Sequence, residues 1–523
     1  MKTDFNPGHA PSLCNQSMIA AYRDQEVAAY KGNPLIEALP AILSEEEAMA
    51  ALRCYPPHRE EDRQAPAHIR YHMVQSALRF FAPLPVHIHL EQCISRLLRG
   101  GYEARNPMHP GYWSEAISRV ESVSSITPLP LHAMTSDPSG MTIIGMSGVG
   151  KTTGVDRSLG LYPQVIHHNH YGGRNFTMSQ IVWLKLACPF DGSIKGLCIN
   201  FFQAVDDLVG TNYYASYTRS RGTVDEMLPH MARVASLHCL GVLIIDEIQH
   251  LNQARSGGSE RMLNFFVQLI NTIGLPVILI GTYGAMEVLS REFRQIRRGC
   301  GQGDLVWDRM KNDDEWAHFV DTLWHYQYTR NNTPLTRELR DALYDECQGI
   351  TDFAKKLYLL AQVRAIANGT ETVTPAVIRS VAADSLRTAG PALDALRRGD
   401  IRVLSTLSDV HPIDFDAYSQ QMRATPRSEV PSAPVPGEPV VHEPNKQPQI
   451  EPAAAPRDVP LSNSPPPVPN KRTKSKKSSA ILPGSLMDIV SRKGRGKLSP
   501  YEALKQANLI CSASEFLEQG AST

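Results

Sequence analysis

Short apolar runs alternate with helix-period segments through the middle of the chain. The runs lie at 141–144, 164–168, 181–187, 241–245 and 276–280. A continuous apolar run is typical of a strand buried on both faces, and a 3.6-residue period is typical of a helix that covers such a strand. The alternation therefore predicts an α/β fold with a mainly parallel sheet and helices on both faces.

Helical patterns without strand candidates flank this part of the chain. They lie at 45–52 and 68–81 before it, and at 314–326, 336–347, 352–366 and 374–386 after it. We predict a helical, partner-binding N-terminal region over 1–125 and the α/β domain over 126–312. A small all-helical unit over 313–390 and a linker over 391–425 follow.

Residues 426–523 are rich in proline and basic residues, a composition typical of a disordered C-terminal tail. Fourteen residues between Pro426 and Pro469 are proline, which leaves little that forms a core and predicts a disordered, extended tether. Residues 471–497 carry nine basic residues and one acid; such a run is often only solvated, but it also suits an acidic partner or nucleic acid. We predict a Pro-rich and basic tether over 426–480 and a partner-binding segment over 481–523, in which 499–518 folds as a short helix.

Overall composition limits the class of protein. Lys plus Arg equals Asp plus Glu at 53 each, so any binding of nucleic acid depends on local patches. The nine cysteines include no C-x-x-C pair, which argues against a disulfide framework or zinc site and favours a reducing cytosol. No apolar stretch reaches the length of a membrane span, and the start lacks the apolar core of a signal peptide. We therefore expect a cytoplasmic protein without a membrane partner.

A glycine-rich turn follows the first apolar run. Its sequence, Gly145-Met-Ser-Gly-Val-Gly-Lys-Thr152, fits the phosphate-binding pattern G-x-x-x-x-G-K-[ST] between a strand and a helix. Glycines let successive backbone N–H groups converge on a polyphosphate at a helix N-terminus, where Lys151 adds positive charge and Thr152 a hydroxyl for magnesium. The predicted nucleotide-binding residues are Gly145, Met146, Ser147, Gly148, Val149, Gly150, Lys151, Thr152 and Thr153.

Two acids, Asp246 and Glu247, end the apolar run 241–245. At the end of a buried parallel strand they emerge where ligands of open α/β sheets bind. Asp246 is predicted to hold magnesium together with Thr152, and Glu247 to orient and polarise the water that attacks the γ-phosphate. The alternative is a solvated acidic turn, but a preceding phosphate loop favours hydrolysis, with ATP and Mg²⁺ as ligands.

These motifs, a later strand that ends in a polar residue, and a helical unit that forms a lid together resemble an AAA+ ATPase. The resemblance implies that the nucleotide lies between neighbouring subunits. Thr282 takes the place of a γ-phosphate sensor, where Asn is more usual, and Lys355 or Lys356 that of a second sensor. One arginine from the end of the helix 285–298 is implied to reach the adjacent subunit, the alternative being a solvated helix end. The four arginines are Arg291, Arg294, Arg297 and Arg298.

Four short sequence segments resemble those of the TnsC family of Tn7-type transposons and, more distantly, those of TniB and MuB. They lie at 79–84, 181–189, 191–198 and 246–251, and the similarity runs over 79–387. It implies an ATP-dependent ring or helical homo-oligomer on duplex target DNA. It also implies a signal from a TniQ- or TnsD-type target selector through the N-terminal region, and recruitment or activation of the TnsA and TnsB transposase through the tail. A helicase loader or replication-initiator-like ATPase shares the same core and is the alternative.

The candidate DNA contacts are basic residues near two predicted turns. Lys195 lies in the first turn of a helix that begins at Asp191-Gly-Ser193, where a lysine is unfavourable unless it faces an anion. Related TniB-like proteins carry a lysine there that meets the DNA backbone. Arg174 follows a flexible Gly-Gly turn near the same groove, and Arg255 and Arg261 are weaker candidates. For each of them a solvated side chain is an equal alternative.

Overall fold

The computed structural model describes residues 17–114, 140–218, 223–253, 258–285 and 304–399, together with the single positions 289 and 420. The predictions for the tether and the C-terminal segment lie outside these residues. So do those for Arg255, Arg291, Arg294, Arg297 and Arg298.

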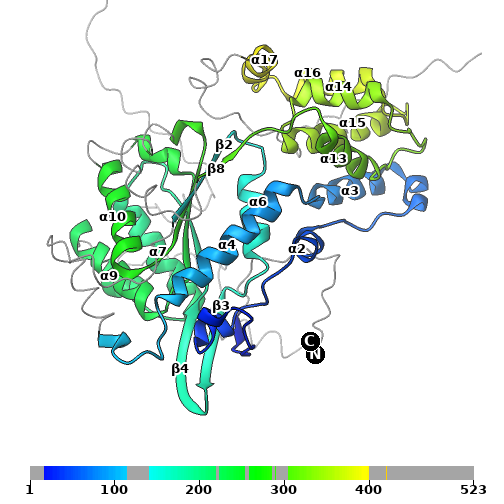
Figure 1. Ribbon diagram of the computed structural model, residues 1–523. Coiled ribbons are helices and arrows are strands. Elements are labelled where there is room, and N and C mark those ends of the chain that lie inside the picture. Colours follow the sequence, from blue (N-terminus) through cyan, green and yellow to red (C-terminus); the bar gives the residue numbers. More distant parts are fainter. Residues whose placement is uncertain are drawn as a thin grey trace, which may run out of the picture. The chain divides into compact units, whose positions relative to one another are not determined.

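A five-stranded parallel sheet forms the centre of the α/β part (Figure 1), in the order β5–β6–β7–β2–β8. The strands are β2 (Gly140–Gly145), β5 (Trp183–Ala187), β6 (Val242–Asp246), β7 (Val277–Gly281) and β8 (Asp304–Trp307). Every residue of the three central strands is buried, as expected of a sheet covered on both faces. The predicted α/β fold is confirmed.

Two helical layers cover the sheet (Figure 1). Side chains alternate between the faces of a strand, so Ile244 packs with one layer and Leu243 and Ile245 with the other. The first layer holds α4 (Pro85–Glu103) and α6 (Lys151–Leu159); the second holds α7 (Ile194–Val209), α9 (Val224–Leu237) and α10 (Gly258–Ile273). The short helix α8 (Tyr213–Tyr217) lies between α7 and α9 along the chain.

The run predicted at 164–168 is a strand, but it does not join the parallel sheet. β3 (Val165–Tyr171) pairs with β4 (Arg174–Ile181) and with β1 (Ser17–Ile19) in a separate three-stranded sheet. Gly172 and Gly173 have φ values of 54° and 75°, the left-handed backbone that closes a tight two-residue hairpin. β1, most of β4 and β8 were not predicted; β8 has only four residues, two of them exposed.

The helical unit after the sheet contains the four predicted helices, each beginning within one residue of its expected start. They are α13 (Asp314–Trp324), α14 (Arg337–Cys347), α15 (Thr351–Ala367) and α16 (Pro375–Ser385). Asp313, Thr336 and Thr374 cap three of them by accepting backbone N–H groups. A further helix, α17 (Gly390–Arg398), lies largely in the part predicted as a linker.

The N-terminal segment packs against both the sheet layer and the helical unit. Its elements are α1 (Pro34–Glu37), α2 (Glu45–Leu52), α3 (Ala67–Ser76) and the 3-10 turns η1 (Ala28–Tyr30), η2 (Glu60–Gln64) and η3 (Ala77–Arg79). α3 contacts α15 and α4 contacts α6 (Figure 1). None of the helices in the described part of the chain is long and apolar enough to span a bilayer.

An ion pair between Arg70 and Glu371, whose side chains are 1% and 13% exposed, links α3 to the helical unit. Arg70 is 1% exposed and donates to both carboxylate oxygens of Glu371 at 2.7 Å, to the carbonyl of Tyr328 and to that of Ala65. Burial raises the pKa of Glu371, but hydrogen bonds from Arg70 and the backbone N–H of Arg330, together with the charges of both arginines, lower this pKa below its usual value. The pair is therefore ionised at neutral pH, and its stabilisation is lost only as the pH falls through the lowered value.

We expect the Arg70→Met variant to lose about 3 kcal/mol of unfolding free energy, because one partner of a buried pair is left uncompensated. Urea denaturation measures the loss, and the double variant Arg70→Met with Glu371→Gln should recover part of it. A loss below about 0.5 kcal/mol, typical of a surface substitution, would show that the pair does not hold α3 in place.

Candidate functional site

The glycine-rich turn joins β2 directly to α6. Gly148 and Gly150 have φ values of 83° and 103°, a backbone region that residues with a side chain rarely adopt. Gly150 provides no side-chain cap, so the first N–H groups of α6 remain available for an anion. The Nζ of Lys151 donates to the carbonyls of Gly145 at 2.9 Å and Met146 at 2.6 Å, which keeps the cation inside the loop.

Asp246 and Glu247 follow β6 at the same end of the sheet. Oδ1 of Asp246 accepts the backbone N–H of Glu247 at 2.9 Å. Glu247 has a φ of 60°, a left-handed backbone that is uncommon for a residue with a side chain and that clusters at functional sites. The 3-10 turn η5 (Ile248–Gln253) follows at once.

Gln249 links Glu247 to the end of the neighbouring strand. Its Nε2 donates to Oε2 of Glu247, and its Oε1 accepts the backbone N–H of Thr282 at 3.2 Å. Thr282 therefore lies close to Glu247, between β7 and the 3-10 turn η6 (Tyr283–Ala285). Gln249 was not predicted, because its role depends on the end of β7, which lies further along the chain.

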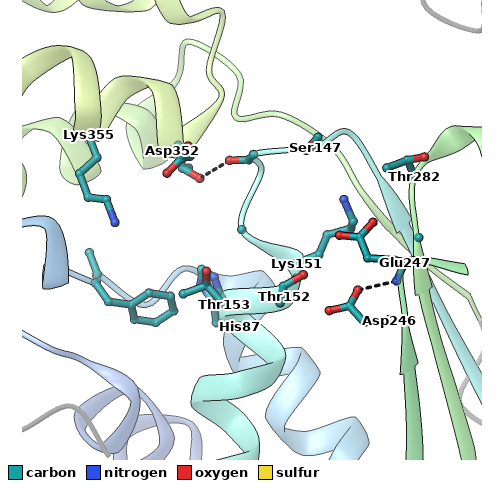
Figure 2. Close-up of a pocket in the computed structure, with 16 residues that line it drawn as sticks. His87, Ser147, Lys151, Thr152, Thr153, Asp246, Glu247, Thr282, Asp352 and Lys355 are labelled. Atoms are coloured by element: carbon teal, nitrogen blue, oxygen red, sulfur yellow. Dashed lines mark hydrogen bonds between the residues drawn. The ribbon is translucent and has the colours of Figure 1, made fainter. Parts of the chain in front are cut away.

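One cavity brings most of the predicted residues together (Figure 2). Gly145, Met146 and Val149 were predicted to bind the nucleotide but do not line this cavity. Its walls come from the glycine-rich turn, the ends of β6 and β7, the segment before α4, the first turn of α4, and α15. The lining residues are Phe81, Ala82, His87, Ser147, Gly148, Gly150, Lys151, Thr152, Thr153, Asp246, Glu247, Gly281, Thr282, Thr351, Asp352 and Lys355. The backbone N–H of Asp352 donates to the carbonyl of Gly148 at 3.1 Å, which ties α15 to the turn.

The wall formed by Phe81, Ala82 and His87 was not predicted as part of the site. Burial lowers the pKa of His87 to about 4, so the ring is neutral at physiological pH. Its Nδ1 lies 2.8 Å from the N–H of Leu84 and accepts it, which places the ring proton on Nε2. The Phe81 ring meets His87 edge-on at 4.7 Å between centroids.

Lys355 faces the cavity from α15, opposite Glu247 (Figure 2). Its Nζ donates to the carbonyl of Leu78 at 2.9 Å, and burial lowers its pKa, while Asp352 acts in the opposite direction. Lys356 instead pairs with Asp352 at 2.8 Å and does not line the cavity. Of the two predicted alternatives for a second sensor, the structure places Lys355 at the site.

The candidate DNA contacts lie on separate elements. Ser193 caps α7 by accepting the N–H of Gly196, so Lys195 stands in the first helical turn, as the sequence indicates. Arg174 is exposed at the start of β4, on the hairpin of the three-stranded sheet. Arg261 forms an ion pair with Asp225.

Comparisons with known proteins support the interpretation of this chain as a nucleotide-binding ATPase, and they do not reach its finer function. Residues 134–289 match a family model described as AAA domain. Among solved structures, the Walker-type ATPase PABY2304 of Pyrococcus abyssi is 14% identical, with a TM-score of 0.32 over 55% of this chain and 76% of that one. ORC1 of Aeropyrum pernix, solved in complex with DNA, is 17% identical, with a TM-score of 0.31 over 57% and 71%. These structural likenesses are too distant to support a function.

ORC2 of Aeropyrum pernix, solved with ADPNP and ADP, is equally remote at 12% identity and a TM-score of 0.33, covering 60% of this chain and 86% of that one. The comparison with curated proteins finds no match. The family match, the parallel sheet and the phosphate loop agree with one another, and they support nucleotide binding and hydrolysis in general. Residues 134–289 therefore resemble an AAA domain, within a mixed α/β fold whose parallel five-stranded sheet is flanked by helices.

Proposed function

We propose that this protein is an ATP-dependent regulator of DNA transposition that oligomerises on target DNA and hydrolyses ATP to limit the lifetime of the assembly. The observation that carries the ATPase part is the single cavity shared by Lys151, Asp246 and Glu247. The resemblance of 79–387 to the TnsC family supports the transposition part.

The residues of the cavity fit ATP with magnesium. Thr152 and Asp246 offer the oxygen ligands that Mg²⁺ prefers, and both line the cavity. When bound, magnesium neutralises charge on the phosphates. Lys151 binds the outer phosphates, Glu247 orients the attacking water and accepts its proton, and Thr282 contacts the γ-phosphate.

The part of the cavity lined by Phe81, Ala82 and His87 is suited to bind the nucleobase. Phe81 and Ala82 provide apolar surface for a planar ring, and the neutral His87 carries a proton on Nε2 for a ring nitrogen. Because Lys355 approaches from α15, the helical unit would close over the nucleotide.

The nucleotide would also join neighbouring subunits. One arginine among Arg291, Arg294, Arg297 and Arg298 would reach the γ-phosphate of the adjacent protomer, since a planar guanidinium suits phosphate. Loss of the γ-phosphate removes the anion that the arginine of the neighbouring protomer binds, which weakens the interface between the two protomers. Hydrolysis through Glu247 would therefore set the time at which DNA is released. The N-terminal region would meet a TniQ- or TnsD-type selector and the tail the TnsA and TnsB transposase, all in the cytosol.

DNA binding tests the proposal most simply. We expect ATP-dependent binding of duplex DNA that is insensitive to sequence and falls steeply with salt, because phosphate contacts dominate. Lys195→Ala and Arg174→Ala should each weaken binding and reduce the logarithmic salt slope by about 1. Arg337→Ala, whose side chain is exposed on α14, is the matched control. If the wild-type protein binds no DNA, the role in transposition is rejected and a nucleotide-dependent signalling role is the remaining function.

Removal of the tail separates the transposition role from that of a helicase loader. A variant ending at residue 425 should keep ATPase activity and DNA binding but activate the transposase less, because the predicted contact segment is gone. Transposition rate in a reconstituted reaction measures the effect. An unchanged rate, or co-purification with a replicative helicase and not with a transposase, would reject the assignment.

A further inference from the structure

A lysine stands between two carboxylates beside the nucleotide cavity. The Nζ of Lys185, on β5, lies 2.5 Å from Oδ1 of Asp156 and 3.4 Å from Oδ2 of Asp246. The three side chains are 20%, 26% and 9% exposed and line a recess next to the end of β6. Neither Lys185 nor Asp156 lines the nucleotide cavity itself.

The three charged groups connect three elements. Asp156 lies on α6, the helix that begins with Lys151 and Thr152, while Asp246 ends β6. The interaction of opposite charges is stronger when water is partly excluded, and two carboxylates without a cation between them repel each other. Lys185 is therefore the group that keeps Asp156 and Asp246 side by side.

The carboxylate of Asp246 is held at both oxygens. Oδ1 accepts the N–H of Glu247 at 2.9 Å, and Oδ2 faces Lys185 at 3.4 Å. These two contacts from different directions restrict rotation of the carboxylate. Its place relative to α6 then depends on the bridge from Lys185 to Asp156.

We propose that Lys185 and Asp156 are positioning residues, which hold the carboxylate of Asp246 at a fixed place relative to the hydroxyl of Thr152. The two proposed magnesium ligands, Asp246 and Thr152, lie on β6 and α6. The ion pairs of Lys185 with Asp156 and Asp246 link these two elements. The proposal rests on that function and adds the residues that set its geometry. Groups that orient a metal ligand from behind typically change metal affinity by about 10- to 100-fold when they are removed.

The test measures nucleotide affinity and not turnover. A fluorescent ATP analogue is titrated into the full chain with Mg²⁺ and again with EDTA, and the ratio of the two affinities gives the gain due to magnesium. In Lys185→Met we expect this gain to fall by about 10- to 100-fold, while affinity in EDTA stays unchanged. Lys185→Arg keeps the charge and should retain part of the gain.

A charge-balanced variant distinguishes positioning from charge compensation. Lys185→Met with Asp156→Asn removes one positive and one negative charge, so the net charge of the cluster is the same as in the wild type. If Lys185 acts by positioning, the affinity gain due to magnesium remains low in this double variant, because no ion pair holds Asp246 in place. A gain restored to the wild-type value would overturn the proposal. Lys31→Met, which breaks an exposed ion pair with Asp24, is the control and should change nothing.

Failure of this proposal and failure of the proposed function give different results. If the wild type gains affinity from magnesium and Lys185→Met gains as much, only the positioning role is wrong. If the wild type binds the analogue neither with Mg²⁺ nor in EDTA, the proposed nucleotide site is wrong, and so is the positioning role. Equal affinity in the two conditions refutes the positioning role alone. Thermal unfolding checks that each variant folds; should Lys185→Met fail, Asp156→Asn alone must show the same reduced gain.

Discussion

The Lys151→Ala variant should lose nucleotide binding and, with it, nucleotide-dependent binding of DNA. Lys151 is 7% exposed and lies inside the phosphate loop, where its Nζ is held by the carbonyls of Gly145 and Met146. A hydrogen bond between charged groups contributes about 1.5–3 kcal/mol, so each lost phosphate contact weakens binding by roughly 10- to 100-fold.

Titration of a fluorescent nucleotide measures this loss directly, and a DNA-binding assay with and without ATP measures its consequence. Lys311→Ala is the matched control, because that lysine is exposed on the connection between β8 and α13. If the Lys151→Ala protein coats DNA as well as the wild type does, the nucleotide does not control assembly.

The Glu247→Gln variant should bind ATP normally but hydrolyse it about 100- to 10,000-fold more slowly, the usual contribution of a general base. Glutamine has the same shape but cannot accept the proton of the attacking water. The cavity keeps Lys151, Thr152 and Asp246, so nucleotide affinity should be unaffected. Assemblies on DNA should then persist far longer than those of the wild type.

Phosphate release and the lifetime of the DNA-bound assembly are the two measurements for this variant. Glu338→Gln, on the exposed face of α14, serves as the control. Slow hydrolysis with a wild-type lifetime on DNA would separate the chemistry from disassembly and refute the timing role of hydrolysis.

The parts of the site that the sequence predicts are those encoded by neighbouring residues. The glycine-rich turn and the Asp246–Glu247 pair are local patterns attached to buried strands, and their chemistry depends on spacing alone. The same holds for the helices of the helical unit, whose apolar period and capping residues lie within each segment.

The parts that were missed depend on pairing over long distances. The run 164–168 was recognised as a strand, but its partners β1 and β4 decide which sheet it joins. Gln249 contacts Thr282, 33 positions along the chain, and Lys185 contacts Asp246 on another strand. His87 lines the cavity only because α4 lies against the glycine-rich turn. An apolar or polar pattern along one segment contains no information about such contacts.

In the proposed assembly, a nucleotide held at Lys151 joins one protomer to the next around duplex DNA. High-resolution electron microscopy of the full chain with DNA and a non-hydrolysable ATP analogue tests it most directly. We predict density for the triphosphate between the loop around Lys151 and an arginine of the adjacent protomer. A loop around Lys151 that is empty and remote from every protomer boundary, at saturating analogue, would show that the nucleotide does not join the protomers.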